Sequence, residues 1–206
     1  MSLVPTELCD IMGACGSDKG THNINRSWHN YTQIYFELFR DRRYMPIRIF
    51  ELGLGTNFTD TPSNMGAGGT PGASLRGWRA FFPQAQIFGA DIDRRILFQE
   101  DRIATFHCDQ TSVTSIAQIP ETGFDIVIED GLHEFDANVC FFENFVSRLN
   151  SGGIFIIEDI CGKTFPMWET QLETWRSRYG DMSFELRRIE SVTNHHDNNL
   201  IIARRN

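Results

Sequence analysis

The sequence predicts an α/β fold in which a doubly wound, Rossmann-like sheet of seven strands ends in an antiparallel hairpin. Two observations carry this expectation: apolar, β-branched runs alternate with amphipathic helical patterns, and the last two such runs follow each other closely. Runs that are apolar at successive positions are typical of strands buried on both faces of a parallel sheet. Their alternation with helices is typical of doubly wound folds.

Seven runs have the composition and length of strands. Five of them carry the pattern expected of buried parallel strands, namely residues 47–53, 86–92, 103–109, 124–130 and 153–159. The last two, 183–191 and 198–205, are joined by a short polar loop. Two strands so close in sequence predict an antiparallel hairpin.

Helical patterns lie before and between these strands. One is expected around residues 30–40, ahead of the first strand, and a second over 74–82, with Ser74 as a candidate cap for its start. A third covers 134–150, where apolar side chains recur at helical spacing, and the Ser-Gly-Gly at 151–153 is expected to end it.

Composition excludes several classes of function. The chain has 206 residues and a net charge of -8, which argues against nucleic-acid binding because phosphate contacts need a basic surface. Its five cysteines are scattered without a CxxC pair, so neither a zinc site nor a disulfide framework is expected. We find no signal-peptide pattern and no apolar run of the ~18 residues that a membrane span needs. A cytoplasmic protein without membrane contact is the expectation.

Three strands in succession end in residues suited to a nucleotide-like cofactor. The first ends in Gly53-x-Gly55, where glycines let the backbone approach a ligand closely. The second ends at Asp91, an acid that can accept hydrogen bonds from both ribose hydroxyls, and the third at Asp109 and Gln110, which face an adenine amino group in this interpretation. A tight turn alone explains the glycines, and helix capping explains each acid equally well. The three strand ends together favour a cofactor site.

The next two strands both end in carboxylates. Residues 124–130 bring Glu129 and Asp130, and residues 153–159 bring Glu158 and Asp159. If these strands are neighbours, their ends lie about 5 Å apart. Carboxylates that close repel one another, and one takes up a proton unless a cation neutralises them. A site for Mg²⁺, which prefers hard oxygen ligands, is therefore expected, and helix capping or pairing with Arg or Lys is the alternative.

His133 follows Asp130 by three residues. A histidine alone is more often structural or solvated, but beside a metal ligand a role as general base is favoured. An imidazole with an unperturbed pKa near ~6.5 accepts a proton at neutral pH. No role is predicted for Glu129.

These motifs resemble a known family. The order Glu51-Leu-Gly53-Leu-Gly55, Asp91, Asp109, "FDIVIED" and "LNSGGIFIIED" is similar to that of class I S-adenosylmethionine-dependent methyltransferases. More narrowly, "SDKGTH", "WHNYTQIYFELF", "ASLRGWRAFFPQAQIFGADID", "EDGLH" and "IIEDI" resemble the macrocin O-methyltransferase branch, which consists of metal-dependent sugar and natural-product O-methyltransferases. The resemblance covers about residues 16–205.

The resemblance implies a class I methyltransferase sheet, with a helical cap or lid segment at 1–45 and an S-adenosylmethionine-binding domain at 46–206, within one compact domain. It implies His133 as general base, assisted by Asp130. The metal ligands implied are Asp130, Glu158 and Asp159. The cofactor-binding residues implied are Glu51, Gly53, Gly55, Ser74, Asp91, Asp109 and Gln110. The long loop at 56–73, which separates the glycine turn from Asp91 by nearly twice the usual ~20 residues, is interpreted as an active-site segment.

The expected function is therefore a Mg²⁺-dependent O-methyltransferase that uses S-adenosylmethionine to methylate a hydroxyl of a sugar or glycosylated secondary metabolite. One alternative is an NAD-dependent oxidoreductase, against which the missing third glycine and the terminal hairpin count. A non-catalytic cofactor-binding protein of the same fold is the other. The identity of the small-molecule acceptor, the native metal and a homo-oligomeric state are left open.

Four further residues have two interpretations each. Lys19 and Tyr31, in the amino-terminal motifs, are candidates to fold over the cofactor or substrate, although helix packing explains Tyr31 as well. Phe165 and Trp168 fit either the wall of an apolar acceptor pocket or the packing of the core.

Overall fold

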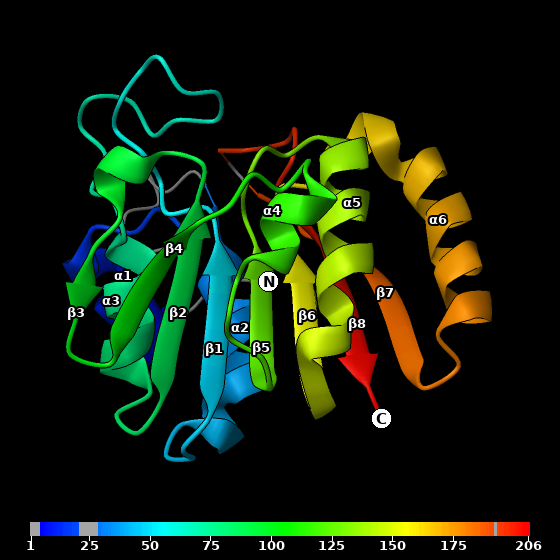
Figure 1. Cartoon of the computed structure of the whole chain (residues 1–206), viewed down its shortest axis with the longest axis horizontal. Helices are drawn as coiled ribbons and strands as arrows, with labels where there is room; N and C mark the ends of the chain where they lie inside the picture. The colour runs from blue at the N-terminus through cyan, green and yellow to red at the C-terminus, as the bar shows by residue number, and fades with distance from the viewer. Residues whose placement is uncertain (1–4, 21–28, 192) are drawn as a thin grey trace.

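The computed structural model describes residues 5–20, 29–191 and 193–206, so motif residues 21, 22 and 28 lie outside it. One sheet has the strand order β3-β4-β2-β1-β5-β6-β8-β7 (Figure 1). Its strands are β1 (Arg48–Leu52), β2 (Gln86–Asp91), β3 (Gln99–Glu100), β4 (Ile103–His107), β5 (Phe124–Glu129), β6 (Leu149–Ile157), β7 (Met182–Arg188) and β8 (Asn199–Arg205).

Strands β4, β2, β1, β5 and β6 are parallel, and the reversed β7–β8 pair joins the sheet through β6. The predicted α/β fold with a terminal antiparallel hairpin is confirmed. The sheet has eight strands rather than seven, because the two-residue β3 pairs with the outer edge of β4.

Helices cover both faces of the sheet (Figure 1). The helices behind the sheet in this view are α1 (Glu7–Cys15), α2 (Tyr31–Phe39) and α3 (Ala73–Phe81). Those in front are α4 (Val113–Ala117), α5 (Phe135–Phe145) and α6 (Phe165–Arg178). Single 3₁₀ turns are η1 (Arg40–Arg42), η2 (Arg94–Ile96), η3 (Val146–Arg148) and η4 (Gly162–Thr164). No helix among the described residues has the length and apolar composition that a membrane crossing requires.

Each face of the sheet has its own aromatic core. In the front core Phe142 of α5 packs on Trp175 of α6 with ring centroids 4.0 Å apart. In the rear core Tyr31, Tyr35 and Phe39 recur every fourth residue of α2, so they line one face of that helix. Helices α1 and α2 thus share a core with β1. The division of the chain at residue 45 and the lid role of its first part stay predictions.

Two local predictions are wrong. Ser74 does not cap α3: Gly72, with φ of +71°, is the cap residue, and the Ser74 hydroxyl donates a hydrogen bond to Glu51. The helix expected over 134–150 ends earlier, at α5 and η3, because Leu149 already pairs with Phe124 of β5 and starts β6. Sheet pairing overrides the helical pattern there.

Candidate active site

A cavity of about 440 Å³ opens at the carboxyl ends of the parallel strands. Small-molecule sites in proteins commonly measure about 300–1,000 Å³. The sequence-predicted residues that line it are Gly53, Gly55, Asp91, Asp109, Gln110, Asp130, His133, Glu158 and Asp159. Glu51 and Ser74 lie behind its wall.

The turn after β1 requires both of its glycines. Gly53 and Gly55 have φ of +88° and +70°, a region that residues with a side chain rarely adopt. A Cβ on Gly53 would lie 1.8 Å from the carbonyl oxygen of Asp130, and one on Gly55 would lie 2.9 Å from Met65. Gly53 therefore lets the end of β1 approach the end of β5, and Gly55 lets the turn approach the long loop at Met65.

Glu51 is fully buried beneath this turn. Its carboxylate accepts hydrogen bonds from the Ser74 hydroxyl and the Trp78 indole. Burial raises the pKa of Glu51, and the Lys19 ammonium 4.0 Å away opposes that rise. The structure thus places Glu51 and Ser74 as a support for the turn, and their assignment as cofactor ligands stays a prediction.

Asp91 is buried at the end of β2 with its carboxylate already oriented. Its oxygens accept the backbone N–H of Leu54 at 2.7 Å and of Asp93 at 2.8 Å. Burial raises its pKa, and these two amides oppose the rise. Each carboxylate oxygen has a second lone pair, so Asp91 can still accept hydroxyl donors from the cavity.

Gln110 and Glu129 form a pair that sequence reasoning missed. The Gln110 amide donates to Glu129 Oε1 at 3.0 Å, and its oxygen accepts the N–H of Leu132 at 2.7 Å. Glu129 Oε1 also accepts the N–H of Gly131 at 3.2 Å. Among the described residues Glu129 Oε2 has no hydrogen-bond partner, and burial raises the pKa of this carboxyl to about 7. The pair fixes the turn that joins Asp130 to His133.

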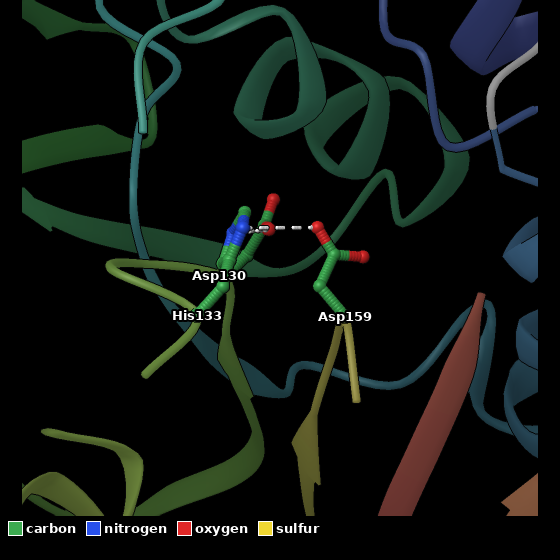
Figure 2. Close-up of side chains that lie close together, drawn as sticks. All are labelled: Asp130, His133 and Asp159. Carbon is green, nitrogen blue, oxygen red and sulfur yellow. Dashed lines mark hydrogen bonds and ion pairs between the residues drawn. The ribbon is translucent and has the colours of Figure 1, made fainter. Parts of the chain in front are cut away.

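The predicted carboxylate cluster forms where β5 and β6 end. In the parallel register Glu129 lies opposite Ile157, which puts Asp130 and Glu158 next to each other. One ligand atom each from Asp130, His133 and Asp159 lies within 4.8 Å of the others. His133 Nε2 lies 3.1 Å from Asp130 Oδ1, and its Nδ1 lies 3.3 Å from Asp159 Oδ2. Figure 2 shows these three side chains converging.

Two residues of this cluster have strained backbones. His133 and Asp159 have φ of +63° and +57°. Positive φ is uncommon outside glycine, and such residues persist where the surrounding structure holds them, often at functional sites. Both conformations turn the side chains toward the same cavity.

Side chains of the amino-terminal segment also donate hydrogen bonds to these carboxylates. The Lys19 ammonium donates to Asp130 Oδ2 and, at 2.6 Å, to Glu158 Oε2. The Tyr35 hydroxyl donates to Glu158 Oε1, and the Tyr31 hydroxyl donates to Asp159 Oδ1 at 2.6 Å. Lys19 and Tyr31 therefore support the acids rather than lining the cavity. Tyr31 and Tyr35 are four residues apart, so the sequence alone indicates that their side chains lie on the same face of a helix.

These contacts set the protonation states of the metal-free cluster. Burial raises the pKa values of Glu158 and Asp159. Burial alone would also raise that of Asp130, but Lys19 and His133 hold it below its usual range. For His133 burial lowers the pKa, and the bond to Asp130 with the charge of Asp159 raises it to about 10. With several carboxylate oxygens and one imidazole, the donors suit a hard divalent cation.

The long loop contributes to the cavity, as the sequence predicts for an active-site segment. Its residues 61–65 line one side, and the Ser63 hydroxyl donates to the carbonyl of Leu132 at 3.0 Å. Phe165 and Trp168 do not line it. Trp168 is buried in the front core and packs edge-on against Phe135, so core packing accounts for it.

No protein-family model matches the chain. It is 35% identical over 135 residues to the 8-demethyl-8-(2-methoxy-alpha-L-rhamnosyl)-tetracenomycin-C 3'-O-methyltransferase of Streptomyces olivaceus, covering 65% of this chain and 33% of that protein. It is 35% identical over 141 residues to the mycinamicin VI 2''-O-methyltransferase of Micromonospora griseorubida, covering 67% of this chain and 33% of the relative. The chain thus spans about a third of the length of these curated relatives.

Solved structures agree on the fold. MycE methyltransferase from the mycinamycin biosynthetic pathway, in complex with Mg and SAH, superposes with a TM-score of 0.73 at 23% identity, over 98% of this chain and 55% of that one. The resemblance recognised in the sequence is confirmed. Over about two thirds of its length the chain is similar in sequence to sugar O-methyltransferases of the macrocin type, and its sheet has the fold of the class I methyltransferases.

Proposed function

We propose that this chain carries the catalytic site of an S-adenosylmethionine-dependent O-methyltransferase that uses Mg²⁺ and methylates a hydroxyl of a sugar or glycosylated secondary metabolite. One observation carries the proposal: the carboxylate cluster with His133 opens into the same cavity as the glycine turn and Asp91. The relatives named for tetracenomycin and mycinamicin glycosides support this acceptor class.

The cofactor would lie along the strand ends. Gly53 and Gly55 allow its methionine end to approach the backbone, Asp91 accepts its ribose hydroxyls, and Asp109 with Gln110 lies where the adenine is expected. The acids on this side of the cavity complement the positive sulfonium. No Lys or Arg side chain among the described residues lines the cavity.

Asp130, Glu158 and Asp159 would hold the metal. When bound, Mg²⁺ lowers the pKa of a chelated acceptor hydroxyl and orients it. His133 takes the proton of this hydroxyl at a ring nitrogen, and the resulting oxygen approaches the methyl group in line. The bond to Asp130 and the charge of Asp159 raise the pKa of His133 to about 10. The same two carboxylates hold the ring at the edge of the cavity.

The test uses calorimetry and a transfer assay. S-adenosylhomocysteine is expected to bind the chain in preference to NAD. With a panel of deoxyhexosyl macrolides as acceptors and excess Mg²⁺, we expect S-adenosylhomocysteine to be formed. Asp130→Asn should lower turnover by ~100-fold or more with little change in S-adenosylhomocysteine binding, since its carboxylate would hold the metal and orients His133.

The matched control is Asp136→Asn, an exposed aspartate of the first turn of α5, which should behave as the unmodified chain. Full turnover in excess chelator would contradict the metal-dependent mechanism. Tight binding of NAD without binding of S-adenosylhomocysteine would favour an oxidoreductase.

A further inference from the structure

A buried lysine occupies the space between two of the carboxylates assigned to the metal. We propose that Lys19 is a built-in cation of this site, that a divalent metal displaces its ammonium from Asp130 and Glu158, and that Glu51 then accepts it. The inference rests on the proposed function, because it takes Asp130 and Glu158 as metal ligands.

The first argument is exclusion. The Lys19 ammonium is 2% exposed and donates at once to Asp130 Oδ2 and Glu158 Oε2. An ion that bridges the same two oxygens, at the ~2.1 Å typical of magnesium, would overlap the position of Nζ. Two cations cannot share this position, so a metal held through these two oxygens requires the ammonium to leave it.

A metal site that leaves Lys19 in place would use a different set of ligands. Asp130, Asp159 and a nitrogen of His133 already converge within 4.8 Å. A metal held there uses His133 as a ligand and leaves Glu158 to Lys19 and Tyr35. The nitrogen that binds the metal can no longer accept the proton of the acceptor, which leaves only the other ring nitrogen. The ligand role of Glu158 through Oε2 therefore requires displacement of Lys19.

A destination for the ammonium is already present. Glu51 Oε1 lies 4.0 Å from Lys19 Nζ, and Glu51 is fully buried. An approach of about 1 Å would bring this pair to hydrogen-bond distance, and clearing the metal position requires a larger swing of the side chain around Glu51. The backbone of Lys19 need not follow, because its N–H donates to Ser17 and its carbonyl accepts from Thr32. Only the side chain moves.

The exchange would couple metal loading to the cofactor site. Glu51 directly precedes the glycine turn, and its carboxylate is held by Ser74 and Trp78. Transfer of the ammonium from Glu158 to Glu51 moves a positive charge from the ends of β5 and β6 to the end of β1. The existing ion pair between Lys19 and Glu51, 4.0 Å apart, then tightens at the moment when the acid cluster gains the metal.

The sequence provides a matched control, because Lys19 and Lys163 are its two lysines. Lys163 is exposed in η4. Calorimetric titration with Mn²⁺ at pH 8 would compare Lys19→Met and Lys163→Met with the unmodified chain. We expect Lys19→Met to bind the metal at least ~10-fold more tightly, or about 1.4 kcal/mol, because no ammonium is displaced. Lys163→Met should leave the affinity unchanged. Equal or weaker binding by Lys19→Met would overturn the inference.

A second measurement needs no substitution of Lys19. With ¹⁵N-labelled lysine the ammonium signals of the two lysines can be followed while MgCl₂ is added. The Lys19 signal should move to a new position as the metal saturates, Glu51→Gln should change that new position, and the Lys163 signal should stay. A Lys19 signal that stays in place while calorimetry shows bound metal refutes this inference alone. If the unmodified chain takes up no metal, the metal-dependent function fails together with it.

Discussion

Glu129, which has no predicted role, offers the sharpest test of the electrostatics of the site. Glu129→Gln keeps the shape of the side chain and the acceptor oxygen that Gln110 and Gly131 use. It removes the charge from a carboxyl group that is 1% exposed and whose second oxygen has no partner among the described residues. Above neutral pH we expect this variant to be more stable than the unmodified chain.

The magnitude follows from the pKa shift. Burial raises the pKa of Glu129 from 4.5 to about 7. Because the pKa in the folded state is raised, the neutral carboxyl contributes stability below pH 4.5, and this contribution is lost as the pH rises through 7. A shift of about 2.5 units at ~1.36 kcal/mol per unit gives about 3.4 kcal/mol. The new amide group costs ~1 kcal/mol where it finds no acceptor. Glu129→Gln should therefore gain about 2 kcal/mol at pH 8.

The assay is urea unfolding of the metal-free protein in chelator, at pH 5, 6, 7 and 8. The advantage of Glu129→Gln in the free energy of unfolding should grow with pH up to about 7 and then level off. Glu134→Gln, at an exposed glutamate directly before α5, is the matched control and should show no such trend. Two results would refute the reasoning. One is a difference in the free energy of unfolding between Glu129→Gln and the unmodified chain that is constant with pH. The other is a loss of stability in Glu129→Gln that is larger at pH 8 than at pH 5.

Two further predictions concern the cavity wall. His133, whose pKa is raised to about 10, stabilises the metal-free fold fully below pH ~6.5 and loses this contribution as the pH rises through 10. In thermal unfolding with chelator, the stability of the unmodified chain should therefore fall more steeply between pH 8 and 10 than that of His133→Gln. Parallel curves for the two proteins would contradict the raised pKa of His133. In Gly53→Ala the new Cβ would lie 1.8 Å from a backbone oxygen at a φ of +88°, so the free energy of unfolding should fall by ~2 kcal/mol or more. In Gly68→Ala the new Cβ has no atom within 4 Å, so urea unfolding should show little loss of stability. An equal loss in the two variants would contradict the steric argument.

The sequence predicted seven of the eight strands, including the hairpin at one edge of the sheet, and missed the short strand β3 at the other edge. Five buried strands could be recognised because long apolar runs have few other structures available to them. Strand β3 has two exposed residues and no periodicity to detect. Helix α6 did carry a signal, since its buried Trp168, Leu172 and Trp175 follow helical spacing. Its polar composition masked that pattern.

The site was predictable where it depends on topology. The carboxyl ends of parallel strands meet at one edge of the sheet, so residues after β5 and β6 had to be close. Alternation along a strand sends adjacent side chains to opposite faces, which separates Glu129 from Asp130. The phenols of α2 and the ammonium of Lys19 were not predictable in this way, because their positions depend on how the amino-terminal segment packs behind the sheet.

That packing changes the argument for a metal. From the sequence, repulsion among Asp130, Glu158 and Asp159 seemed to demand an external cation. In the structure the chain supplies part of this charge itself: the Lys19 ammonium contacts both Asp130 and Glu158, and the two ring nitrogens of His133 face Asp130 and Asp159. Two cationic side chains beside three carboxylates make repulsion alone weak evidence for a metal in this fold. The geometric evidence is stronger, because Asp130, His133 and Asp159 each place one ligand atom within 4.8 Å of the others.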